Sequence, residues 1–99
     1  MNASEKVYKA VSKIPKGKIA TYKQIAKICG IKNPRTVGFY LHKNIDPKTI
    51  PCHRVIRSDG QLASNYAFGG HKKQKEILEK EGIKFVGDKI NLKKYSYYN

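Results

Sequence analysis

The chain has 99 residues, which suits one domain, and its 21 Lys and Arg against 7 Asp and Glu give a formal net charge of +14. Hydrophobic residues make up 39% of the chain, too many for a disordered basic tail. No apolar run approaches the roughly 18 residues of a transmembrane helix. The first 13 residues lack an uninterrupted apolar stretch, so we expect no signal peptide and a cytoplasmic or nucleoid location.

The two cysteines, Cys29 and Cys52, are too few for a disulfide framework or a zinc ribbon. We therefore expect free thiols in a reducing compartment, with no metal site and no cofactor. Cys29 is predicted to lie in the core of a helix.

The excess of positive charge indicates an anionic partner. Nucleic acid is the first candidate, because contacts from Lys and Arg to phosphates release counterions, and an anionic membrane surface is the second. The third interpretation is an ordinary solvated surface, since the lysines are spread over the whole chain rather than gathered in one block.

The first predicted helix covers residues 4–13, with Ser4 as its N-cap. Its apolar stripe, at helical spacing, is Val7, Ala10, Val11 and Ile14. Residues 15–17 (Pro-Lys-Gly) end the helix, and residues 18–20 form a short extended link.

Two short helices follow, joined by a tight turn. Thr21 and Gln24 form a capping-box pattern at the start of the first, and Gly30 ends it. Asn33 and Pro34 are typical of the N-cap and first residue of the second, which runs to about residue 43. This is a helix-turn-helix pattern, whose second helix would be presented to DNA.

After a loop over residues 44–51, residues 55–63 predict a β-hairpin around an Asp59-Gly60 turn, placed like a wing. A fourth helix is predicted over residues 71–81 and a small hairpin over residues 83–92. The Tyr-rich residues 93–99 are expected to fray. The predicted fold is mainly α with small β-hairpins, a single winged helix-turn-helix-like domain over residues 1–99. Its core covers about residues 5–85, and residues 86–99 form a terminal hairpin and tail.

The chemistry lies in one pentapeptide, Pro51-Cys52-His53-Arg54-Val55. Proline fixes its own φ and so holds the cysteine at a defined bend. A neighbouring imidazole and guanidinium favour the thiolate, which is the nucleophilic form. Taken alone, the motif is also compatible with a buried, inert cysteine and a surface histidine.

In its context the motif resembles the DNA-binding and active-site domain of the O6-alkylguanine-DNA alkyltransferases. The further matches, all in family order, are Tyr22 at a helix start, the segment Arg35-Thr36-Val37-Gly38, Asn44 eight positions before the cysteine, Tyr66-Ala67-Phe68-Gly69 and Glu81-Gly82. The resemblance covers about residues 7–85.

The resemblance implies a mechanism and a role for each matched residue. Family members bind the minor groove of double-stranded DNA, flip the damaged guanine out of the stack and move its alkyl group irreversibly to the cysteine. The implied catalytic residues are Cys52 as nucleophile, His53 as base through a bridging water, Glu81 as the carboxylate that orients it, and Asn44 as a hinge. The implied DNA- and base-binding residues are Tyr22, Arg35, Thr36, Gly38, Arg54, Val55 and Tyr66.

The chain also departs from the family pattern. Small residues usually follow the glycine of the recognition helix, whereas Phe39 and Tyr40 stand here. We expect one of the two rings to pack inward and the other to face DNA. Asn44 is followed by Ile45 rather than proline, and Ala67 stands where some members have a serine that donates to the guanine O6.

Full-length members carry a further N-terminal domain, and a stand-alone domain of this size is typical of the alkyltransferase-like proteins. Those sense the lesion and recruit repair proteins, but they replace the cysteine that this chain keeps at Cys52. The leading hypothesis is therefore a monomeric, single-turnover alkyltransferase. The alternatives are a non-enzymatic lesion sensor with a repair-protein partner and a plain winged-helix DNA-binding protein.

Overall fold

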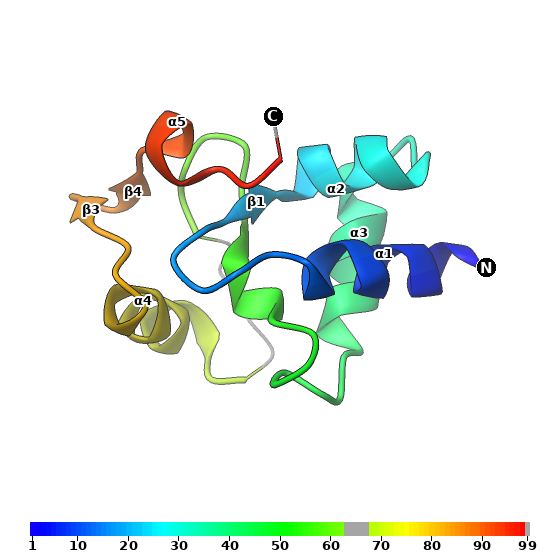
Figure 1. Ribbon diagram of the computed structural model, residues 1–99, viewed down its shortest axis with the longest axis horizontal. Coiled ribbons are helices and arrows are strands. Elements are labelled where there is room, and N and C mark those ends of the chain that lie inside the picture. Colours follow the sequence, from blue (N-terminus) through cyan, green and yellow to red (C-terminus); the bar gives the residue numbers. More distant parts are fainter. Residues whose placement is uncertain (63–67, 99) are drawn as a thin grey trace.

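The computed structural model describes residues 1–62 and 68–98, and the chain folds into one mainly helical domain with short strands, as predicted (Figure 1). The elements in order are α1 (Ala3–Ser12), β1 (Ala20–Thr21), α2 (Tyr22–Cys29), α3 (Pro34–His42), the 3-10 turn η1 (Cys52–Arg54), β2 (Val55–Ile56), α4 (Gly70–Lys80), β3 (Phe85–Val86), β4 (Lys89–Ile90) and α5 (Leu92–Tyr95). None of the helices in the described part is long and apolar enough to span a membrane.

Helix α1 starts one residue before the predicted start, and its N-cap is Asn2 rather than Ser4. The Asn2 side chain accepts a hydrogen bond from the Glu5 amide at 2.9 Å, and the Glu5 carboxylate faces the Asn2 amide in return. This reciprocal pair forms a capping box, so the prediction for Ser4 is wrong. Ser4 lies inside the helix, and its hydroxyl donates to the Asn2 side chain.

The caps of the helix pair α2 and α3 are as predicted. The Thr21 hydroxyl and the Gln24 amide close a capping box at the start of α2, and Gly30 ends the helix in the left-handed region with φ of 71°. Asn33 caps α3, which begins with Pro34 and ends at His42, within a residue of the prediction.

The predicted wing hairpin over residues 55–63 does not form as such. Strand β2 pairs in parallel with β1, with Ala20 opposite Val55 and Thr21 opposite Ile56. The turn itself is present, since the Arg57 amide donates to the Gln61 carbonyl at 2.9 Å. Beyond it, however, Gln61 bridges to Lys89 of β4 instead of extending a ladder with β2. Ala63, the end of the predicted second arm, lies outside the described residues.

The reason for this pairing is that β2 is buried on both sides. Two hydrophobic clusters flank the short β1–β2 sheet, and Val55 belongs to one while Ile56 belongs to the other. Because successive strand residues point to opposite faces, both side chains are fully buried, whereas a wing would expose one face. Figure 1 shows the arrangement, with α1, α2 and α3 on one side of β1 and with α4, β3, β4 and α5 on the other.

The C-terminal segment also differs from the prediction. The β3–β4 hairpin is confirmed, but the tail after it is not frayed over the described residues up to Tyr98. Tyr95 is buried, Ser96 bridges to Ile19 beside β1, and the Tyr98 hydroxyl donates to the Ala10 carbonyl of α1 at 2.7 Å. These tyrosines anchor the tail against both halves of the core.

Candidate active site

The pentapeptide forms a tight turn that buries its cysteine. Pro51 precedes η1, the Arg54 amide donates to the Pro51 carbonyl at 2.9 Å, and the Cys52 amide donates to the Ile50 carbonyl at 2.7 Å. Cys52 is 5% exposed and packs with the cluster that includes α1, α2 and α3. The turn therefore places the Cys52 thiol against the core that α1, α2 and α3 form.

Burial raises the pKa of the Cys52 thiol, although a hydrogen bond from Asn44 and the neighbouring backbone N–H groups act in the opposite direction. Asn44 is itself buried, and its amide group donates to the Ile50 carbonyl at 2.9 Å. Asn44 thereby links the end of α3 to the loop that leads into Cys52. In the free protein the thiol is protonated at neutral pH, so a proton acceptor is needed to form a nucleophile.

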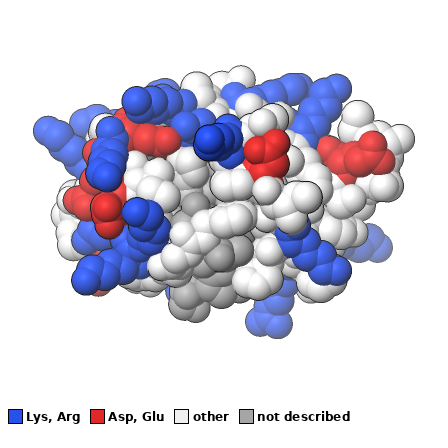
Figure 2. Space-filling model, turned by 90° about the horizontal axis from the view of Figure 1, so that it is seen from below, with Lys and Arg blue, Asp and Glu red and all other residues white. Residues whose placement is uncertain are grey.

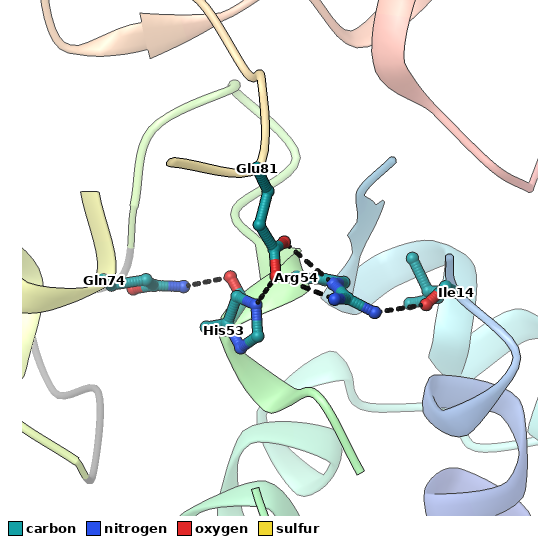
Figure 3. Close-up of polar contacts among 5 residues, drawn as sticks. All are labelled: Ile14, His53, Arg54, Gln74 and Glu81. Atoms are coloured by element: carbon teal, nitrogen blue, oxygen red, sulfur yellow. Dashed lines mark hydrogen bonds and ion pairs between the residues drawn. The ribbon is translucent and has the colours of Figure 1, made fainter. Parts of the chain in front are cut away.

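His53 is next in sequence, and its imidazole is paired with a carboxylate. Nε2 of His53 is 3.0 Å from Oε2 of Glu81, at the end of α4 (Figure 3). Burial favours the neutral acid form of Glu81, but hydrogen bonds from Arg54 and His53 outweigh it and lower the pKa of the carboxyl below 4.5. An ionised carboxylate only accepts hydrogen bonds, so Nε2 of His53 carries the proton and Nδ1 is the unprotonated, basic nitrogen. Burial also lowers the pKa of His53, which keeps the ring neutral and able to accept a proton.

Arg54 turns inward. Its Nε donates to Oε1 of Glu81 at 2.9 Å, its Nη2 to Oε2 at 2.7 Å, and its Nη1 to the Ile14 carbonyl at 2.8 Å. Figure 3 shows the Glu81 carboxylate between the His53 ring and the Arg54 guanidinium. The sequence prediction placed Arg54 among the DNA-binding residues; in the free protein its guanidinium is occupied by these partners.

Gln74 is the residue that the sequence analysis missed. It is 1% exposed on α4, and its Nε2 donates to the backbone carbonyls of His53 at 2.9 Å and Val55 at 3.3 Å. A glutamine four residues before the buried Leu78 lies on the inward face of the helix, and that spacing was the available signal. Through these two hydrogen bonds, Gln74 connects α4 to the backbone of the active-site turn.

Tyr22 lies at the start of α2. Burial, with a smaller contribution from the nearby Cys52, raises its pKa to about 12. The phenol therefore stays neutral and remains a hydrogen-bond donor at physiological pH. Gly38 of α3 faces this ring, and a Cβ at Gly38 would lie 3.7 Å from Cε1 of Tyr22.

A hollow of about 720 Å³ opens beside this pair. Its lining includes Tyr22, Arg35, Gly38 and Phe39, so it gathers three of the predicted DNA-binding residues. Cys52 and the buried Val55 are not part of the lining, and neither is Thr36. Tyr66, predicted to form a wall of the alkyl pocket, lies outside the described residues, as does Ala67.

Residues 2–83 match the sequence profile described as "6-O-methylguanine DNA methyltransferase, DNA binding domain". The chain belongs to this family. Its members are DNA repair proteins of the O6-alkylguanine type, and the fold and the resemblance found in the sequence are thereby confirmed.

Two kinds of relative fall within the family. The methylated-DNA–protein-cysteine methyltransferase of Methanothermobacter thermautotrophicus is 45% identical over 82 residues, which are 83% of this chain but only 45% of that protein. Alkyltransferase-like protein 1 of Schizosaccharomyces pombe is 39% identical over 99 residues, which are 93% of this chain and 91% of that protein. The chain thus spans about half the length of the first relative and nearly all of the second.

The similar solved structures also include both alkyltransferase-like proteins and longer methyltransferases. S. pombe Atl1 in complex with DNA containing O6-carboxymethylguanine superposes with a TM-score of 0.82 at 36% identity, covering 98% of this chain and 95% of that one. The OGT of Mycobacterium tuberculosis in complex with DNA superposes with a TM-score of 0.76 at 34% identity, covering 83% of this chain and 49% of that one. Both neighbours were solved bound to DNA.

Proposed function

We propose that this protein binds O6-alkylguanine in duplex DNA, flips the base out of the stack and accepts its alkyl group on Cys52. The observation that carries the proposal is a thiol followed by a neutral histidine whose second nitrogen is fixed by an ionised carboxylate. A sensor that only binds the lesion needs neither the nucleophile nor the base beside it.

The transfer balances as a displacement at the alkyl carbon. The sulfur of Cys52 forms the new S–C bond while the bond from that carbon to guanine O6 breaks. The thiol proton leaves through the bridging water that the family resemblance implies toward Nδ1 of His53, and Glu81 stabilises the imidazolium that forms. The Tyr22 hydroxyl donates its proton to the guanine ring as the bond to O6 breaks, and the imidazolium of His53 gives up its proton to restore the neutral phenol through solvent. The thiol proton thus ends on the leaving base, and the protein keeps a thioether.

Base flipping is required because the alkyl carbon cannot reach a buried thiol from inside the duplex. Arg35 is exposed on α3 and faces the same hollow as Tyr22, where it can occupy the space that the flipped base leaves. The excess of Lys and Arg supplies the attraction to phosphates. In Figure 2, Lys and Arg side chains lie mostly around the margin of one face, with a few acidic side chains among them.

Intact-protein mass tests the proposal. After incubation with a duplex carrying O6-methylguanine, we expect a gain of one CH₂, since a methyl group replaces the thiol proton. The Cys52→Ala variant should show no gain and should still bind the lesion. The Cys29→Ala variant is the matched control, because Cys29 is the other free, buried thiol and should be dispensable.

A second function, non-enzymatic lesion sensing, is supported by the match over nearly the full length of the S. pombe alkyltransferase-like protein. Its signature in the same experiment is selective binding of the O6-methylguanine duplex with no gain in mass on any variant. We also propose that the protein acts as a monomer, which sedimentation of the free and DNA-bound forms would check.

A further inference from the structure

Phe39 is a large apolar side chain on the outer face of the recognition helix. The buried residues of α3 are Val37 and Leu41, and Tyr40 packs partly against the core, whereas Phe39 is 57% exposed. The ammonium group of Lys43, one turn further along, lies 4.3 Å from the centre of its ring. The Phe39 ring is therefore not part of the hydrophobic core. It lies at the surface beside the Lys43 ammonium group.

The same ring forms one wall of the 720 Å³ hollow. Pro34, Gly38 and the ring of Tyr22 supply further uncharged lining, while Lys23, Arg35 and Arg57 supply positive charge. No carboxylate is among the described residues that line it, although Asp59 pairs with Arg57 just outside at 2.7 Å. A lining that combines uncharged rings with cationic side chains matches a nucleic acid strand, whose bases present flat faces and whose phosphates are anionic.

We propose that Phe39 is an aromatic DNA contact, packing against a base of the duplex beside Arg35 while one strand lies in this hollow. Aromatic and other apolar side chains can wedge against base steps from the minor groove and favour unstacking. The contact would assist base flipping at this lesion site, so the inference rests on the proposed function. It also gives a role to the residue that most clearly departs from the small side chains expected at this position.

The test uses duplex affinity and base unstacking together. Phe39→Ala should weaken binding at least about fivefold, the equivalent of the lower bound of ~1 kcal/mol for a base–aromatic contact. It should also reduce the fluorescence rise of a 2-aminopurine placed next to O6-methylguanine. Phe39→Tyr keeps a ring and should retain both signals within about twofold.

The dependence of binding on salt separates a ring contact from a charge contact. Phe39→Ala removes no charge, so the slope of log affinity against log salt should stay unchanged. A slope reduced by about one would mean that the variant acts by displacing Lys43, and it would overturn the inference. Val86→Ala is the matched control, since Val86 is 79% exposed on the β3–β4 hairpin, in the other half of the molecule (Figure 1).

Two further outcomes would overturn the inference without touching the proposed function. One is parental affinity and parental 2-aminopurine signal in Phe39→Ala. The other is a dimer of the free protein that Phe39→Ala abolishes, which would make a second copy the occupant of the hollow. If the parent itself shows no preference for the lesion duplex and no gain in mass, the proposed function fails instead.

Discussion

Arg54 and Glu81, 27 residues apart in the chain, are joined by two hydrogen bonds of 2.9 and 2.7 Å in a fork-to-fork arrangement. The pair links the active-site turn to the end of α4, and the third bond of Arg54 reaches the carbonyl of Ile14, two residues after the end of α1. Because the guanidinium keeps Glu81 ionised, it also decides which nitrogen of His53 carries a proton. A structural ion pair thus determines the state of the proposed catalytic base.

The first prediction concerns this pair. Glu81→Gln leaves the Arg54 guanidinium, whose side chain is 16% exposed, without its counter-ion. We expect a loss of about 3 kcal/mol in the free energy of unfolding at pH 7, the lower end for breaking a buried pair. Urea unfolding measures the loss, and Glu79→Gln, at an exposed site on the same helix, should change stability by less than about 0.5 kcal/mol.

The pH dependence of the stability of Glu81→Gln tests whether the loss comes from the ionised Glu81 carboxylate. The pKa of Glu81 is lowered in the folded state, so the unfolded chain binds a proton first as the pH falls. The stabilisation is complete above pH 4.5, the ordinary pKa, and is lost as the pH falls through the lower folded pKa. The stability gap between parent and Glu81→Gln should therefore shrink below pH 4.5; a constant gap would contradict this assignment.

The sequence predicted those parts of the fold that local signals determine. The capping box at Thr21, the left-handed glycine at Gly30 and the Asn33-Pro34 start are all readable from neighbouring residues. The pairing of β2 was not readable, because a two-residue strand between two hydrophobic clusters has no periodicity to distinguish it from a hairpin arm. The anchoring of the tail by Tyr98 was missed for a similar reason, since its partner, Ala10, lies 88 residues away.

In the candidate site, too, contacts between distant residues could not be predicted from local sequence patterns. The pairing of His53 with Glu81 was expected only through the family resemblance, since no local pattern relates positions 28 apart. Arg54 was assigned to DNA through the same resemblance, and only the fold places Glu81 beside it. Gln74 was not singled out, because its two partners are backbone carbonyls, which carry no sequence signal.

The second prediction concerns Gln74. Gln74→Glu places a carboxylate against the carbonyl oxygens of His53 and Val55, and a buried charge facing two acceptors costs about 3 kcal/mol at pH 7. Protonation would restore a donor, so the loss should diminish at acidic pH. Gln74→Leu is the control: it removes the donor but also Oε1, a buried atom without a partner among the described groups, and should cost about 1 kcal/mol. Equal losses at pH 7 would contradict the electrostatic account.

The third prediction concerns the reactivity of Cys52 in the absence of DNA. Its pKa is raised above 9.0, so alkylation by iodoacetamide in a Cys29→Ala background should accelerate across pH 7–9 without reaching a plateau. Asn44→Ala removes a hydrogen bond that opposes the upward shift, and it should slow labelling severalfold throughout this range. Mass spectrometry follows both rates. A plateau near neutral pH would mean that the free protein already holds a thiolate and needs no base.

The last prediction separates Arg35 from Lys23, another cationic residue that lines the hollow. Both are exposed, and both can attract phosphate. Lys23→Ala should weaken binding of damaged and undamaged duplexes alike and reduce the salt slope by about 0.9, the value for one phosphate contact. Arg35→Ala should weaken lesion binding, 2-aminopurine fluorescence and alkyl transfer more than it weakens binding to an undamaged duplex, because filling the space of a flipped base matters only when a base is flipped. If Arg35→Ala behaves as Lys23→Ala does, Arg35 contacts phosphate only, and another side chain, with Phe39 the first to examine, must take the place of the flipped base.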